Sequence, residues 1–148
     1  MQIHPRVLIA AEYSLMLQVV ESMLMAIGFR KIAHARNAEQ ALTRLQGASY
    51  GLVIAEWDMK PKSGLDLLTA MRLDDRLLNI PFIMLSTASL DERAAAAKEA
   101  GADGLLAKPF DMAQLRDMIA TCLIAAAQRR AEEAALRSAG AMRDARGA

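Results

Sequence analysis

Tyr50-Gly-Leu-Val-Ile-Ala55 is the stretch that decides the fold, because it is a short run rich in Val, Ile and Leu. A run of this kind is typical of a strand that is buried on both faces of a parallel sheet. A polar turn with Pro61 and Gly64 follows it, and a helical pattern then continues through Arg72. The sequence therefore predicts a buried strand followed by a helix.

The same alternation recurs on both sides of this unit, so that apolar runs and helical patterns alternate five times. The predicted strands are 6–10, 31–35, 50–55, 82–85 and 104–107, and the predicted helices are 14–27, 37–46, a segment ending at 72, 90–100 and a last one from 111 onward. Regular strand–helix alternation favours a parallel sheet with helices packed against it. We therefore predict an α/β fold, a five-stranded parallel sheet with helices on both faces (flavodoxin-like) and an extended C-terminal helix.

Length and composition narrow the class of protein further. The chain has 148 residues and 54% of them are apolar, which suits one domain with a well-buried core. No apolar stretch is long enough and free enough of charge for membrane insertion. Cys122 is the single cysteine, which excludes a disulfide framework and predicts a reducing, cytoplasmic setting. A net charge of +1 argues against a basic surface for DNA.

The last predicted helix is unusually long, since it begins at Asp111 and meets no glycine or proline until Gly140. Only its first half carries an apolar stripe for the core, made of Leu115, Met118, Ile119, Cys122 and Leu123. We therefore divide the chain into a domain at 1–127 and an arginine-rich helical extension at 128–148. The extension is expected to project from the domain or to stay partly disordered until it binds, with residues 140–148 as a frayed end.

Four motifs lie at or near the ends of the predicted strands. They are Val7-Leu-Ile-Ala-Ala-Glu-Tyr-Ser14, Gly51-Leu-Val-Ile-Ala-Glu-Trp-Asp-Met59, Ser86-Thr-Ala88 and Ala107-Lys-Pro-Phe110. In combination they resemble the motifs of CheY-like receiver domains, over about residues 5–125. The resemblance implies that two acidic residues after the first strand hold Mg²⁺, and that an aspartate after the third strand accepts a phosphoryl group. It also implies a phosphate-binding hydroxyl and lysine, and a cis bond before Pro109.

The matching positions of this chain depart from that pattern. The metal-binding positions are Ala11 and Glu12, the acceptor position is Glu56, and the hydroxyl and lysine positions are Ser86 and Lys108. Because Mg²⁺ needs a tight octahedral set of oxygens, its binding should be weak or absent, and phosphorylation should be poor. Two interpretations of Glu56 stay open. In the first it imitates a phosphorylated aspartate beside Lys108, and in the second it is a relic that forms a structural ion pair. Asp58 as a displaced acceptor is a less favoured alternative.

Five arginines follow the core stripe of the last helix. They are Arg129, Arg130, Arg137, Arg143 and Arg146. Guanidinium groups form paired hydrogen bonds with phosphate and also bind guanine. The tail resembles that of CheY-like proteins that bind cyclic di-GMP through an arginine-rich extension, which implies these arginines as ligand contacts. The alternative is a solvated, charged helix end with Glu132 and Glu133 as partners.

Three functions fit these features. The favoured one is a non-enzymatic adaptor that needs no phosphorylation or cofactor, binds cyclic di-GMP through its tail and docks on a protein such as the flagellar motor switch. By resemblance, the docking face combines the fourth helix, fifth strand and fifth helix, and it includes Ala97 and Leu105. The alternatives are a true phosphoacceptor in a histidine-kinase pathway and a constitutive scaffold without a ligand.

Overall fold

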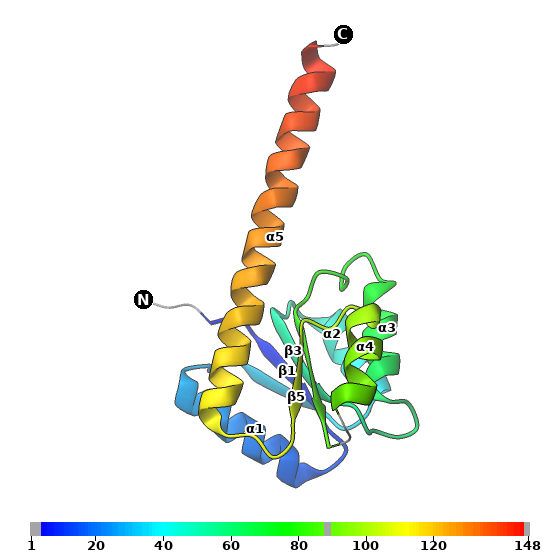
Figure 1. The fold of residues 1–148 in the computed structure, drawn as a ribbon, viewed down its shortest axis with the longest axis vertical. Helices are drawn as coiled ribbons and strands as arrows, with labels where there is room; N and C mark the ends of the chain where they lie inside the picture. The colour runs from blue at the N-terminus through cyan, green and yellow to red at the C-terminus, as the bar shows by residue number, and fades with distance from the viewer. Residues whose placement is uncertain (1–3, 88–89, 147–148) are drawn as a thin grey trace.

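The computed structural model describes the backbone of residues 4–87 and 90–146 and the side chains of residues 4–87 and 92–140. Strands and helices alternate along this part of the chain (Figure 1). The strands are β1 (Val7–Ala10), β2 (Ile32–Ala35), β3 (Leu52–Glu56), β4 (Phe82–Ser86) and β5 (Gly104–Ala107). The helices are α1 (Ser14–Ile27), α2 (Ala38–Gly47), α3 (Gly64–Arg72), α4 (Leu90–Ala100) and α5 (Met112–Arg146).

The sheet is parallel, with the strand order β2-β1-β3-β4-β5. This is the flavodoxin-like order, in which sites lie at the carboxyl ends of the strands. Helices α1 and α5 cover one face of the sheet, and α2, α3 and α4 cover the other (Figure 1). The predicted α/β fold is therefore confirmed.

The strand side chains divide the core into two layers, because successive side chains of a strand point to opposite faces. In β1, Val7 and Ile9 pack with α1 and α5, whereas Leu8 and Ala10 pack with α2 and α3. All four residues are fully buried. This two-sided burial is the reason why the strands are continuous apolar runs in the sequence.

Local signals fix most of the helix ends. Asn37 caps α2, since its side-chain oxygen accepts a hydrogen bond from the backbone N–H of Gln40 at 2.8 Å. Gly28, with a φ of 130°, ends α1 in a conformation that favours glycine. Asp111 and Gln114 exchange side-chain-to-backbone hydrogen bonds of 2.9 and 2.8 Å at the start of α5. These ends lie where the sequence predicted them.

The end of α5 differs from the prediction. The helix continues through Gly140 to Arg146, so the expected frayed end is wrong for these residues. A glycine inside a helix costs only about 1 kcal/mol relative to alanine, and the alanine, leucine and arginine residues around it are strong helix formers. Residues 147 and 148 lie outside the described part.

The second half of α5 leaves the body of the domain. Leu115, Ile119, Cys122 and Ala126 are buried against the sheet, whereas every residue from 127 to 139 is exposed. Figure 1 shows this half projecting beyond the sheet. Burial raises the pKa of the Cys122 thiol to about 11, as suits a core residue. Within the described ranges, no helix is both long and apolar enough to cross a membrane.

Candidate functional site

The parallel register brings the functional positions to one edge of the sheet. Ala10 of β1 lies beside Ala55 of β3, so the residues that follow each strand emerge side by side. Glu56 pairs in register with Leu85 of β4, and Ser86 pairs with Ala107 of β5. Ala11, Glu12, Glu56, Ser86 and Lys108 therefore meet at the carboxyl edge, as predicted.

Glu56 and Lys108 form an ion pair at the centre of this edge. The Lys108 Nζ donates to Glu56 Oε1 at 2.7 Å. The side chains of Glu56 and Lys108 are only 7% and 18% exposed. The acceptor-position carboxylate is thus taken out of water and neutralised by a residue of the same protein.

Arg93 of α4 makes a second set of contacts at the same edge. Its two terminal nitrogens each donate to one carboxylate oxygen of Asp58, both at 3.0 Å. Its Nη1 also donates to the Ser86 hydroxyl oxygen at 3.0 Å. The guanidinium lies 4.6 Å from the centre of the Trp57 ring, at cation–π distance. The hydrogen bond from Arg93 lowers the pKa of the Asp58 carboxyl below its usual value of 3.8.

At the other acidic position, Glu12, the hydrogen bonds to the rest of the site are made by the backbone carbonyl oxygen and not by the carboxylate. Its carbonyl oxygen accepts from Nε and Nη2 of Arg36 at 3.1 and 3.0 Å. Its carboxylate has no hydrogen bond or ion pair with any residue that the structure describes. Ala11 is fully buried and offers no side-chain oxygen.

Among the carboxylates at this edge, only that of Glu12 has no cationic partner in the described part of the chain, so the edge does not present the set of free oxygens that a magnesium site needs. Mg²⁺ needs several oxygens in octahedral geometry, but the carboxylate of Glu56 is paired with Lys108 and that of Asp58 is paired with Arg93. Across the described part of the chain, no cluster of three or more His, Cys, Asp or Glu side chains is arranged for a metal ion. Weak or absent Mg²⁺ binding stays a prediction, and these two ion pairs give it a physical reason.

The tail arginines fall into three groups. Arg129 lies 2.9 Å from Asp103, a carboxylate that also binds Arg72 and the backbone N–H of Phe82. Arg130 and Arg137 are exposed on the projecting helix. The side chains of Arg143 and Arg146 lie outside the described residues. Arg129 therefore has an internal partner that the sequence pattern did not predict.

The predicted docking face needs one correction. Ala97 is only 2% exposed because it points from α4 toward the core, so it is wrong as a surface contact. Ala94 and Ala95 are the exposed small residues of this helix. Leu105 is partly buried, packed against the core.

Arg93 is the site residue that the sequence analysis missed. Its contact with Asp58 joins positions 35 residues apart, which no local pattern reports. The available signal was an arginine in the first turn of an otherwise alanine-rich helix that starts after Ser86.

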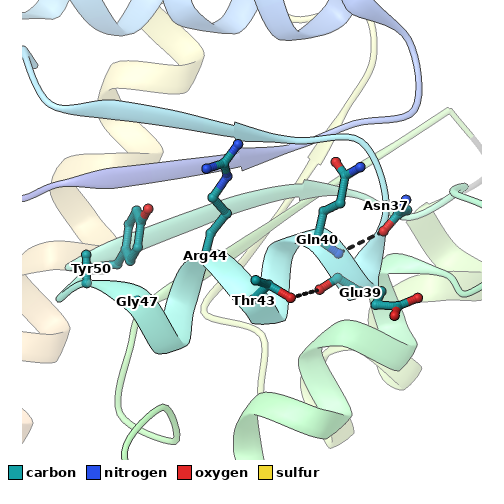
Figure 2. Close-up of a pocket in the computed structure, with 8 residues that line it drawn as sticks. Asn37, Glu39, Gln40, Thr43, Arg44, Gly47 and Tyr50 are labelled. Atoms are coloured by element: carbon teal, nitrogen blue, oxygen red, sulfur yellow. Dashed lines mark hydrogen bonds between the residues drawn. The ribbon is translucent and has the colours of Figure 1, made fainter.

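A polar hollow of about 700 Å³ lies along α2, between Asn37 at its start and Tyr50 beyond its end (Figure 2). Its lining residues include Gln40, Thr43, Arg44 and Tyr50. The hydrogen bonds drawn there are local helix contacts, such as Thr43 Oγ1 to the Glu39 carbonyl at 3.1 Å. None of the five predicted site positions, Ala11, Glu12, Glu56, Ser86 and Lys108, lines this hollow, so we assign the site to the carboxyl edge.

Comparison with known proteins agrees with this arrangement. The family described as Response regulator receiver domain matches residues 7–120. Chemotaxis protein CheY of Pseudomonas aeruginosa is 30% identical over 114 residues, which cover 77% of this chain and 92% of that protein. Chemotaxis protein CheY-3 of Vibrio cholerae is also 30% identical, over 77% of this chain and 88% of that protein. The solved structure of the chemotaxis response regulator CheY4 of Vibrio cholerae has a TM-score of 0.76 and 26% identity, and covers 82% of this chain and 100% of that one.

Proposed function

The chain belongs to the family of response regulator receiver domains, and we propose that it is a cytoplasmic signalling adaptor that works without phosphorylation. The Glu56–Lys108 ion pair carries this proposal. A lysine that binds phosphate in other receivers is here paired at 2.7 Å with a glutamate in the acceptor position. The lysine is therefore already paired with a carboxylate of the same chain without a phosphoryl group.

The chemistry of phosphoryl transfer supports the same conclusion. Transfer depends on positioning and on a metal ion that neutralises the developing charge. Ala11 removes a metal ligand, and the two ion pairs occupy the carboxylates of Glu56 and Asp58. We therefore propose that the protein has no phosphotransfer activity and is not an enzyme.

Incubation with acetyl phosphate and Mg²⁺, followed by intact-mass measurement, tests this proposal. We expect no added phosphoryl group on the wild-type chain. Ala11→Asp/Glu56→Asp is the matched comparison, because it restores a carboxylate at a metal position and an aspartate at the acceptor position. A Mg²⁺-dependent mass increase of the wild type that disappears in Glu56→Gln or Asp58→Asn would overturn the proposal.

The ligand that we propose is cyclic di-GMP, bound by the projecting half of α5. Arg130 and Arg137 are both exposed. Because they are seven residues apart, they share one face of the helix. Arginine serves both parts of this ligand, through paired hydrogen bonds to phosphate and to guanine O6 and N7. Arg129, Arg143 and Arg146 complete the proposed contacts, and Arg129 would have to exchange Asp103 for the ligand.

Calorimetric titration with cyclic di-GMP tests the ligand. We expect micromolar binding to the full chain, weakened at least tenfold in Arg130→Ala/Arg137→Ala and absent in a chain that ends at Ala127. Arg116→Ala is the matched control, because Arg116 is an exposed arginine on the body half of the same helix. Equal binding by the full and shortened chains, or none at micromolar concentration, would leave the ligand-free scaffold as the better function.

The partner in this proposal is a protein, with the flagellar motor switch as the candidate. The support is the similarity to relatives named as chemotaxis proteins. The proposed docking face consists of α4, β5 and the first half of α5, with Ala94, Ala95 and Leu105 on it. Pull-down of purified motor switch protein by the wild type, but not by Ala95→Glu, would support the face. Equal capture by both would contradict it.

A further inference from the structure

The side chains of residues 92–100, the part of α4 where they are described, give the helix a weak apolar attachment to the rest of the domain. It is rich in alanine, and among its described side chains only Ala97 is fully buried in the core. Burial of an alanine contributes little compared with the large side chains that anchor the other helices. For residues 92–100, polar contacts are therefore the main attachment to the sheet.

Arg93 supplies such contacts, and it joins α4 to the loop after β3 and to the end of β4. Its guanidinium binds Asp58 in the loop after β3, the Ser86 hydroxyl at the end of β4 and the Trp57 ring. The side chain of Arg93 is 22% exposed, whereas that of Asp58 is 60% exposed, so the arginine is the more buried partner. In the part of α4 whose side chains are described, all side-chain hydrogen bonds to the sheet edge come from Arg93.

Charge explains why a cation suits this place. Besides Glu12, the edge carries the carboxylates of Glu56 and Asp58, and the ion pair of Lys108 is with Glu56. Arg93 neutralises the second and, through Ser86, also binds the strand that bears the hydroxyl position. A planar guanidinium can make both carboxylate bonds in one geometry, which a lysine cannot.

We propose that Arg93 is a positioning residue that locks α4 to the site by taking the place of an external cation. The inference rests on the proposed phosphorylation-independent function, because it names how that site holds its docking face without a phosphoryl group. Ala94 and Ala95 follow Arg93 on the same helix. Their position is therefore set by the contacts between Arg93 and Asp58.

Trp57 makes this lock observable, because it is the single tryptophan of the chain. We would compare Arg93→Ala, Arg93→Lys and Asp58→Asn with the wild type, using Trp57 fluorescence and hydrogen exchange of residues 92–100. All three variants should change the Trp57 emission and accelerate exchange in α4 by about two- to fivefold, because an ion pair with a carboxylate as exposed as that of Asp58 has a modest strength. Arg93→Lys should fail to restore the wild type, since it keeps the charge but loses the two-bond geometry. Lys98→Ala, an exposed change on the same helix, is the control and should alter neither readout.

The near-isosteric Asp58→Asn variant keeps the test valid even if Arg93→Ala fails to fold. Unchanged exchange in α4 for Asp58→Asn and Arg93→Lys would overturn the proposal, and so would full rescue by Arg93→Lys. These readouts are independent of the phosphorylation assay. If the wild type accepts a phosphoryl group while the variants show faster exchange in α4, only the proposed function is contradicted. If the wild type accepts no phosphoryl group and exchange in α4 is unchanged in the variants, only the proposed role of Arg93 is contradicted.

Discussion

At the scale of single residues, one methylene group separates Glu56 from the aspartate that receivers use in this position. Its carboxylate meets the Lys108 ammonium at 2.7 Å in a mostly buried setting. Such a pair gains Coulomb energy but also loses hydration, so its net contribution to stability is small. The cost becomes large when one partner is removed, because the other charge stays buried without compensation. The pair is therefore better understood as fixing the state of the pocket than as stabilising the fold.

Lys108→Met tests this view. We expect it to lower the free energy of unfolding by roughly 3 kcal/mol or more, because Glu56 loses the partner of its buried charge. Glu56→Leu/Lys108→Met removes both charges and should recover most of that loss. Urea unfolding followed by circular dichroism measures both values. If the double variant is as unstable as Lys108→Met alone, the pair contributes more than charge compensation, and our account is incorrect.

Asp58 gives a pH-dependent prediction at the same scale. Its pKa lies below 3.8 because Arg93 donates hydrogen bonds to its ionised form. A lowered folded-state pKa means that ionised Asp58 stabilises the fold above the unfolded value, and that this contribution is lost as pH falls through the folded value. In Arg93→Ala, the Asp58 pKa should rise toward 3.8 in a carboxyl-carbon NMR titration, while Lys98→Ala should leave it unchanged. If the pKa of Asp58 is the same in Arg93→Ala and in the wild type, Arg93 is not the cause of the lowered pKa.

At the scale of elements, the sequence predicted what depends on local and periodic patterns. The strands are continuous apolar runs because both faces are buried, and caps such as Asn37 and Gly28 lie where backbone geometry requires them. The strand-end residues could also be predicted, because a parallel register brings them together. Arg93–Asp58 and Arg129–Asp103 could not, because each joins distant positions whose side chains meet only in the folded chain. The burial of Ala97 was missed because an alanine-rich helix has no clear apolar stripe.

Two glycines in helices, Gly64 and Gly140, should respond differently to substitution by alanine. A Cβ on Gly64 would clash with the Glu56 carbonyl oxygen, so Gly64→Ala must push the start of α3 away from the site. We expect it to lower the free energy of unfolding by about 1–3 kcal/mol in urea unfolding. A Cβ on Gly140 would meet nothing within 4 Å. Gly140→Ala should therefore slow hydrogen exchange near the end of α5 and leave global stability unchanged. A stabilising Gly64→Ala would contradict the close packing of α3 on the acceptor strand.

At the scale of the whole molecule, the chain combines a compact sheet domain with a helix that extends beyond it. From Gln128 to Arg146 the helix is about 28 Å long at 1.5 Å per residue. An isolated helix of this length is marginally stable in water. The extension must therefore be supported by the part of α5 that packs on the domain and by any bound partner. Among the described residues, one ion pair, Arg129 with Asp103, joins the exposed segment to the body. The body should therefore fold independently of the extension.

Two shortened chains test this independence. A chain that ends at Ala127 keeps the buried residues Leu115, Ile119, Cys122 and Ala126 and loses only the exposed segment. We expect its free energy of unfolding to fall by no more than about 1 kcal/mol, because the lost ion pair involves an Arg129 that is 52% exposed. A chain that ends at Asp117 also loses Ile119, Cys122 and Ala126, and each large buried side chain is worth about 1.5–3 kcal/mol. Since the whole domain is stable by only about 5–15 kcal/mol, this second chain should be largely unfolded by circular dichroism. A loss well above 1 kcal/mol for the chain ending at Ala127 would mean that the extension packs on the body, and the cyclic di-GMP titration with that chain would then no longer separate binding from folding.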